Sequence, residues 1–213
     1  MLSKTKHTLL FIDTETTGLT STDQIMQFAA IYGVFDGKKL HEEGRINQYV
    51  NITTPINFWA QRVHGLSKSM VATYKYIDHY IDDFLTPLSN AHCVIGHNIA
   101  FDLRMLQQEC SRIGKAYDRT TVNTYCTMQD ARHLVDLPGR KRLKLSALYE
   151  HLFGASFAHA HDAMADIEAT KNCFVELAKR GEIIMREGKL SPNTPELPPK
   201  GLLKKLQKAQ KIS

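Results

Sequence analysis

Two acidic residues stand two positions apart at the end of a strongly hydrophobic run. The run Leu9–Ile12 leads into the stretch FIDTETTGL, which contains Asp13 and Glu15. Side chains alternate along a strand, so both carboxylates would point to one face and repel each other. A hard divalent cation such as Mg²⁺ prefers oxygen ligands and would relieve that repulsion. On these residues alone, an acidic turn without a ligand is the alternative.

A third acid lies in the stretch IGHNIAFDLRML, residues 95–106. A short apolar strand ends at Gly96, and helical spacing then predicts a buried stripe of Ile99, Leu103 and Leu106. Asp102 would lie at the edge of that stripe, near the carboxyl end of the strand, where open α/β sheets bind ligands. Taken singly, Asp102 could instead be a favourable acid in the first turn of a helix.

The stretch HAHDAMADIEAT, residues 159–170, adds a histidine and a fourth acid. His161 precedes a predicted helix and Asp166 lies inside it, among small alanines that permit close approach of a ligand. A capping or surface histidine is the alternative for His161. Four carboxylates, one histidine and no cysteine ligand together fit two Mg²⁺ or Mn²⁺ ions about 3.5–4 Å apart, as used to hydrolyse phosphodiesters.

The three motifs DTETTGL, GHNxxFD and HxAxxDxxAT, in this order, resemble those of the DEDDh (DnaQ-like) 3′–5′ exonucleases. That family includes the proofreading epsilon subunit of bacterial DNA polymerase III, and the resemblance covers about residues 7–178. It implies that Asp13 bridges both cations, that Glu15 and Asp166 complete one cation site, and that Asp102 helps to hold the other. It also implies that His161 is the general base.

The same resemblance implies a pocket for the terminal nucleotide of the substrate. The backbone around Thr16 and Thr17 would meet that nucleotide, and Leu19 would pack on its base. The remaining pocket residues would be His97, Asn98 and Phe101.

Strand and helix patterns alternate along the chain and place these motifs at the ends of elements. We predict strands at 7–13, 25–35, 43–51, 92–96 and 121–126. We predict helices at 56–63, 78–89, 98–112, 127–135, 145–152 and 162–179. The dipeptide Asp36-Gly37 predicts an antiparallel hairpin. These patterns favour an α/β mixed sheet, and the resemblance implies the ribonuclease H-like fold, a five-stranded mixed sheet with helices on both faces.

Composition and charge narrow the class of protein. The 213 residues are 43% hydrophobic and 23% charged, as in globular proteins, and no apolar run is long enough to span a membrane. The four cysteines show no CxxC pattern, which argues against a zinc site and favours a reducing compartment. We therefore expect a cytoplasmic protein without a signal peptide or membrane partner.

The end of the chain differs in composition from the rest. The segment 191–199, SPNTPELPP, predicts an extended linker, and the five lysines of 200–213 account for the whole net charge of +5. We predict an exonuclease domain at 1–181 and a Pro-rich linker with a Lys-rich tail at 182–213. The tail would serve substrate retention or partner docking, and the basic run 140–144 could touch phosphates.

These observations predict a metal-dependent 3′–5′ exonuclease that acts on single-stranded DNA or DNA 3′ ends in proofreading or repair, with a DNA polymerase as a candidate partner. One alternative is an exoribonuclease with the same chemistry, because no residue visibly reads a 2′-hydroxyl. A second is a non-catalytic, polymerase-associated nucleic-acid-binding module, which has no need to hold mutually repelling acids. A third, an aspartyl phosphatase, would want an aspartate in place of Glu15.

Overall fold

The fold centres on one mixed β-sheet in the computed structural model, which describes residues 6–138, 141–158, 161–186 and 189–193. The strand order is β3-β2-β1-β4-β5. The strands are β1 (His7–Thr16), β2 (Ile25–Phe35), β3 (Leu40–Tyr49), β4 (Cys93–Gly96) and β5 (Thr124–Cys126). Strand β2 is antiparallel to β1 and β3, whereas β4 is parallel to β1 and β5 is parallel to β4. The predicted five-stranded mixed sheet and its hairpin at Asp36-Gly37 are confirmed.

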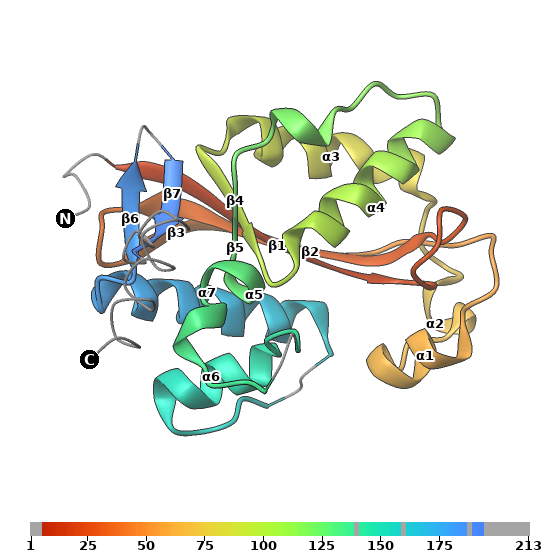
Figure 1. Ribbon diagram of the computed structural model, residues 1–213. Helices are drawn as coiled ribbons and strands as arrows, with labels where there is room; N and C mark the ends of the chain where they lie inside the picture. Colours follow the sequence, from red (N-terminus) through yellow and green to blue (C-terminus); the bar gives the residue numbers. More distant parts are fainter. Residues whose placement is uncertain (1–5, 139–140, 159–160, 187–188, 194–213) are drawn as a thin grey trace, which may run out of the picture.

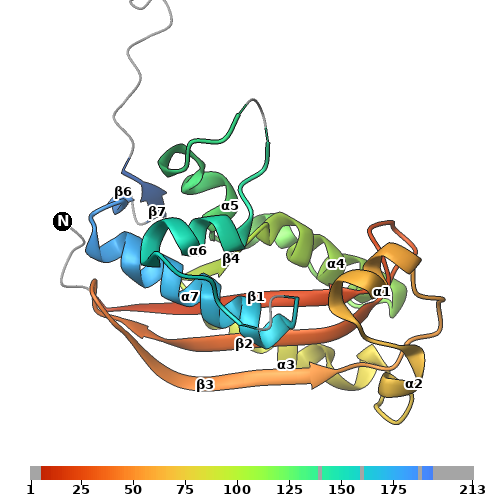
Figure 2. The same cartoon turned by 90° about the horizontal axis from the view of Figure 1, so that it is seen from below.

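Helices cover both faces of this sheet (Figures 1 and 2). On one face lie α3 (Ile77–Asn90) and α4 (Ile99–Arg112), and on the other lie α6 (Leu145–Phe153) and α7 (Ala163–Lys179). In β1, Leu9 and Phe11 pack toward α7, while Leu10 and Ile12 pack toward α3 and α4. Because both faces are buried, β1 is a continuous apolar run rather than an alternating one.

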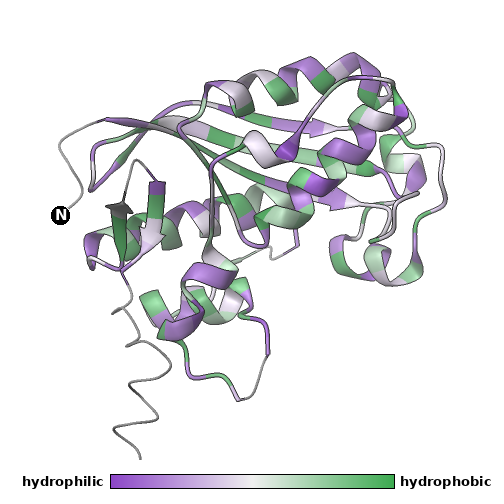
Figure 3. Ribbon diagram, turned by 45° about the horizontal axis from the view of Figure 1, so that its top comes forward, coloured by the Kyte–Doolittle hydropathy of each residue, from purple (hydrophilic) through white to green (hydrophobic). Residues whose placement is uncertain are grey.

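Aromatic rings fill the core on both faces. The Phe174 ring makes edge-to-face contacts with Phe11, Phe35 and Tyr125, each at a centroid distance of 5.5 Å. On the opposite face Phe28 stacks on Phe84 of α3 at 4.1 Å. Hydrophobic residues accordingly run along the central strands in Figure 3.

Two short helices, α1 (Phe58–His64) and α2 (Lys68–Val71), lie beyond the ends of β1 and β2 (Figure 1). Asn57 caps α1 by accepting a hydrogen bond from the backbone of Trp59, and Gly65, with φ of 75°, ends it. No residue of α1 is buried. Tertiary contacts of its ends, rather than a packed face, therefore hold α1 in place.

Three short elements flank β5, and two of them stand where a helix over 127–135 was predicted. They are η1 (Arg119–Thr121), which precedes β5, α5 (Thr127–Asp130) and η2 (Arg132–Leu134). The helix prediction is wrong in length, because the backbone leaves the helical region at Ala131. The Arg132 guanidinium donates to the carbonyls of Val135, Leu137 and Lys141, which holds the chain in a loop.

A two-stranded hairpin, β6 (Ile183–Arg186) and β7 (Lys189–Pro192), follows α7. Ile183 and Leu190 are buried in the α7-side core, so the packed structure continues past the predicted boundary at residue 181. The remainder of the predicted linker, the Lys-rich tail and Arg140 of the basic run lie outside the described residues. Among the described helices, none is long and apolar enough to cross a membrane.

Candidate metal and nucleic-acid site

The alternation of β1 sorts the acids of the first motif by sheet face. Asp13 and Glu15 continue the positions of Leu9 and Phe11, so they point to the face that α7 covers. Asp166 lies in the first turn of α7. One carboxylate oxygen from each of these three acids lies within 4.8 Å of the others. The sequence-predicted convergence of β1 and α7 acids is therefore present in the structure.

Asp102 approaches from the opposite face. Thr14 follows the alternate positions of β1, and its hydroxyl donates a 2.8 Å hydrogen bond to Asp102 Oδ1. Asp102 lies in the first turn of α4 and is 2% exposed. It is not one of the three acids that share the 4.8 Å cluster, but its charge raises the pKa of Asp13 and of Glu15.

His161 stands immediately before α7 and is exposed. Its backbone N–H donates to both carboxylate oxygens of Asp166 at 3.3 Å. Its φ is 74°, a left-handed conformation that is uncommon outside glycine. Asp162 caps α7 by accepting from Met164 and Ala165. The turn thus places His161 beside the acid that the motif pairs with it.

Burial disfavours the charged form of all four carboxylates, and repulsion by the neighbouring acids adds to it at Asp13 and Glu15. Burial raises the pKa of Glu15 to about 8, with Asp166 the next cause, and burial raises the pKa of Asp102 to about 7 despite the bond from Thr14. Burial, followed by the charge of Asp102, raises the pKa of Asp13 well above its ordinary value. Burial also raises the pKa of Asp166, against the His161 N–H. Oxygen donors that repel each other in this way fit a hard divalent cation, which would restore their charged form.

A cavity of about 440 Å³ opens beside the acids. Its lining includes Glu15, Phe101 and Leu19, and the Leu19 side chain is 73% exposed. Helix α1 contributes Trp59 and Val63 to the lining. The volume and mixed lining suit one nucleotide with an apolar base and a charged phosphate.

The backbone between β1 and the cavity is held by internal hydrogen bonds. Thr16 Oγ1 donates to the carbonyl of Gly18 at 2.7 Å, and Thr17 Oγ1 donates to Asp23 at 2.8 Å. The N–H of Asn57 donates to the carbonyl of Thr17 at 2.7 Å. Thr16 and Thr17 are both buried, so their side chains shape the loop.

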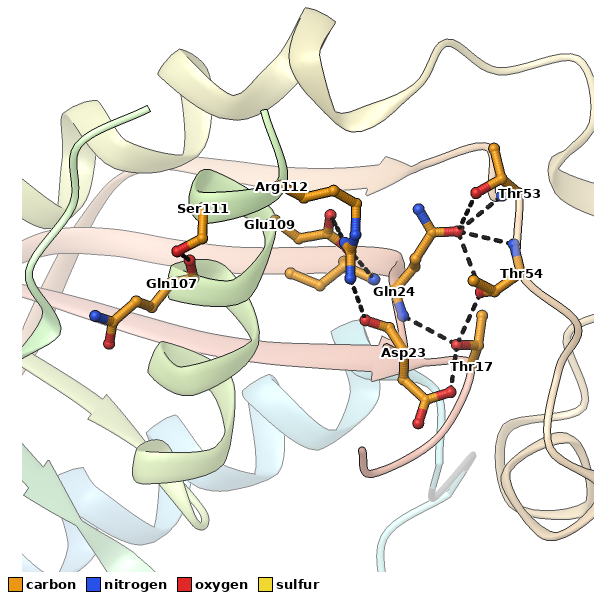
Figure 4. Close-up of polar contacts among 10 residues, drawn as sticks. Thr17, Asp23, Gln24, Thr53, Thr54, Gln107, Glu109, Ser111 and Arg112 are labelled. Atoms are coloured by element: carbon orange, nitrogen blue, oxygen red, sulfur yellow. Dashed lines mark hydrogen bonds and ion pairs between the residues drawn. The ribbon is translucent and has the colours of Figure 1, made fainter. Parts of the chain in front are cut away.

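Helix α4 fixes the far end of this loop (Figure 4). The buried Glu109 accepts a 2.8 Å hydrogen bond from the N–H of Ile25 and forms an ion pair with Arg112. Arg112 in turn donates to the carbonyl of Asp23 at 3.0 Å. The helix that carries Asp102 therefore also positions the loop that carries Thr17.

Two other predicted pocket residues have structural partners. The ring nitrogens of His97 bond the Thr127 hydroxyl and the carbonyl of Leu143, each at 2.9 Å, and burial lowers the pKa of His97 to about 4. Asn98 precedes α4 with φ of 86°, and its carbonyl accepts from Phe101. Neither His97 nor Asn98 is among the residues that line the cavity.

The α1 wall was not assigned to the site from the sequence. Trp59 is the only tryptophan of the chain, and its large apolar side chain is 69% exposed. His64 accepts from the N–H of Leu66, and its Nε2 lies 3.2 Å from the carbonyl of Thr16, which ties α1 to β1. The sequence shows an aromatic and a histidine five residues apart, but not that α1 packs over the end of β1.

A family model of exonucleases, RNase_T, matches residues 10–174. The chain belongs to this exonuclease family. The predicted membership of the DEDDh (DnaQ-like) group is confirmed, and the three motifs on β1, α4 and α7 are those on which it was predicted.

Two curated relatives illustrate the breadth of this exonuclease family. A PolC-type DNA polymerase III from Caldanaerobacter subterraneus subsp. tengcongensis is 28% identical over 170 residues, which are 79% of this chain and 11% of the relative. The DNA polymerase III epsilon subunit of Rickettsia conorii is 30% identical over 176 residues, which are 79% of this chain and 72% of that subunit. The chain thus spans only a small part of the PolC-type relative.

Solved structures of exonucleases share the fold. The crystal structure of E. coli exonuclease I in complex with a dT13 oligonucleotide gives a TM-score of 0.69 at 20% identity, covering 82% of this chain and 41% of that one. A 3′-exonuclease described in 3′-end-specific recognition of a histone mRNA stem-loop gives 0.67 at 16% identity, covering 90% and 72%. The fold is therefore the ribonuclease H-like fold.

Proposed function

We propose that this protein is a 3′–5′ exonuclease that releases nucleoside monophosphates from the 3′ end of DNA with two Mg²⁺ or Mn²⁺ ions. The observation that carries the proposal is the cluster of Asp13, Glu15 and Asp166 beside a nucleotide-sized cavity, with Asp102 buried behind it. Membership of the exonuclease family supports the hydrolysis of nucleic acids.

The acids of β1 and α7 would hold the cations in place. When bound, the cations supply the positive charge that ionises a water molecule and offsets the charge that builds up on the phosphate. The hydrogen bond from Thr14 fixes the orientation of Asp102. The backbone bond from His161 to Asp166 keeps the imidazole close to the acid cluster, so His161 would take the proton from the attacking water.

The cavity would select the end of the strand. Leu19 and Phe101 would contact the terminal base, and the exposed Trp59 would offer a stacking surface. The water then attacks the terminal phosphorus and the bond from phosphorus to O3′ of the preceding nucleotide breaks. The nucleoside 5′-monophosphate leaves, and O3′ takes a proton from solvent and becomes the new 3′-hydroxyl.

RNA is the second candidate substrate. The structural neighbour described with a histone mRNA stem-loop favours it, while the neighbour in complex with dT13 favours DNA. Because relatives are named as subunits of DNA polymerase III, a role in proofreading with a polymerase partner is part of the proposal. A binding module without catalysis is disfavoured, because folding alone gives no reason to gather acids whose pKa values are raised.

The test is product analysis with matched end-labelled DNA and RNA strands, in Mn²⁺ and in chelator. We expect stepwise release of 5′-monophosphates from the 3′ end of DNA that stops in chelator. In Asp13→Asn the rate should fall more than the roughly 10–100-fold that loss of an outer-shell metal partner causes. The control is Asp83→Asn, an exposed acid on α3.

Three results would contradict the proposal. They are an unchanged rate in Asp13→Asn, degradation from the 5′ end, or tight DNA binding without cleavage in any metal. If RNA is cleaved as fast as DNA or faster, RNA becomes the proposed substrate in place of DNA.

A further inference from the structure

A second cavity, of about 540 Å³, is lined by α4, by Arg119 and by Ser21 of the loop that joins β1 to β2. We call it the α4 groove, because most of its lining comes from the outer face of that helix. The lining includes Ser21, Arg104, Gln107, Ser111, Arg112 and Arg119. Three of its residues are arginines, and none of the residues that line it is acidic.

Two of the three arginines carry charge that no carboxylate neutralises by a direct ion pair within the described part of the chain. Arg112 is paired with the buried Glu109, whereas Arg104 and Arg119 form no such pair. The hydrogen bonds from Thr120, and to a lesser extent the charge of Arg119, lower the pKa of Asp118, but Asp118 does not line the groove. The α4 groove is therefore electropositive, although residues 1–199 carry no formal net charge.

The groove adjoins the cavity of about 440 Å³ beside the acids, which we call the nucleotide cavity. Arg104 donates to the carbonyl of Leu19 at 3.2 Å, and its guanidinium carbon lies 5.2 Å from the centre of the Phe101 ring. Leu19 and Phe101 line the nucleotide cavity, whereas Arg104 and Ser21 line the groove. A strand whose 3′ end lies at the acids can continue only in the 5′ direction, and the groove offers it a path.

The chemistry of the groove fits phosphate rather than an acidic protein. Arginine, glutamine and serine side chains donate hydrogen bonds to phosphate oxygens in protein–nucleic acid complexes. Gln107 and Ser111 lie one helical turn apart on α4 (Figure 4). The lining contains no aromatic or large aliphatic side chain, which the core of a protein–protein interface would require.

We propose that the α4 groove binds the phosphodiester backbone of the substrate strand on the 5′ side of the terminal nucleotide. This inference rests on the proposed function for the direction of the strand. It assigns Arg119 and Gln107 to strand binding and not to the chemical step.

The test compares Arg119→Gln with Lys38→Gln. Lys38 is an exposed cation in the β2–β3 turn, at the end of the sheet where His7 pairs with Phe35 and therefore opposite the acids. Within the described part of the chain, the side chains of Arg119 and Lys38 form no hydrogen bond or ion pair, so both variants should fold. Gln107→Glu is a second variant, which places a negative charge in the groove.

The assay is fluorescence anisotropy in chelator with single-stranded oligonucleotides of about 4 and about 20 nucleotides, over a range of salt concentrations. One lost phosphate contact lowers the salt slope by about 0.7 on a single strand, which is about fivefold in affinity at 0.1 M salt. We expect this loss for Arg119→Gln with the long strand only, and a loss at least as large for Gln107→Glu. Hydrolysis of thymidine 5′-monophosphate p-nitrophenyl ester should stay at the wild-type rate in both.

Equal binding of the long strand by Arg119→Gln and Lys38→Gln would overturn the proposal. So would weaker binding of a polyglutamate peptide with unchanged oligonucleotide binding, which would make the groove a site for acidic protein. The binding assay does not depend on cleavage. Wild-type protein that cleaves nothing would refute the proposed function, and the loss in Arg119→Gln would still support the groove.

Discussion

The raised pKa values of the acid cluster predict that, without a cation, the protein loses stability as pH rises from 6.5 to 8. Glu15 has a folded pKa of about 8 and an ordinary value of 4.5. In this window the folded state keeps the proton and the unfolded state does not, so the free energy of unfolding falls with pH. At about 1.4 kcal/mol per pH unit, the ionisation of Glu15 lowers the free energy of unfolding by about 2 kcal/mol across the window. Asp102, with a folded pKa of about 7, adds less because it ionises early in the window.

The window starts at pH 6.5 so that the effect of His97 on the free energy of unfolding does not overlap with that of the acids. Burial lowers the pKa of His97 from 6.5 to about 4, so its contribution to stability grows as pH rises and is complete near 6.5. Above pH 6.5 the carboxylates determine how the free energy of unfolding changes with pH. Raising the pH from 6.5 to 8 therefore reports on the acids, and we expect the free energy of unfolding in chelator to fall by about 2–3 kcal/mol.

The assay is urea unfolding followed by circular dichroism at several pH values, in chelator and in Mn²⁺. Bound Mn²⁺ should raise the free energy of unfolding most at pH 8, where the carboxylates are ionised. Glu15→Gln should flatten the slope in chelator, whereas Asp83→Asn should keep it. A free energy of unfolding that stays level or rises from pH 6.5 to 8 in chelator would refute the reasoning, as would an unchanged slope in Glu15→Gln.

Two further predictions concern aromatic side chains. Phe174→Ala removes the ring that three others contact and should lower the free energy of unfolding in urea by about 3–5 kcal/mol, whereas Phe153→Ala, at a ring that is 40% exposed, should cost much less. An equal cost for both would contradict the packing described for Phe174. Trp59→Ala should raise KM for DNA about 5–150-fold through a stacking loss of about 1–3 kcal/mol, with kcat little changed in steady-state assays. A fall in kcat at constant KM would place Trp59 in the chemical step instead.

The fold could be predicted where burial leaves a periodic trace in the sequence. The apolar run of β1, the β2–β3 hairpin at Asp36-Gly37 and the stripe of α7 each follow from local patterns, and the structure has them. The acids were identified because their motifs stand at the ends of such elements. The parallel pairing of β1 with β4 brings Asp102 near the acids of β1, and the packing of α7 on β1 brings Asp166 there.

What could not be predicted depends on contacts between distant segments. The end of β7 was predicted as linker because it begins the proline-rich segment 191–199, yet Pro192 is tolerated in a strand that pairs on one side only. His97 stands in a motif as a pocket residue, but only the fold brings Thr127 and Leu143 to its ring. The wall formed by Trp59 depends on how α1 sits over the loop at Thr17.

Helix α1 contributes a wall to the nucleotide cavity without burying any of its own side chains. Its attachments are the hydrogen bond from Asn57 to the Thr17 carbonyl and the contact of His64 with the Thr16 carbonyl. Its outward residues can therefore be exchanged at little cost to folding, because the hydrophobic interior does not depend on them. Under the proposed function, substitutions on this helix of about two turns would change the contacts with the nucleotide and leave the acid cluster as it is.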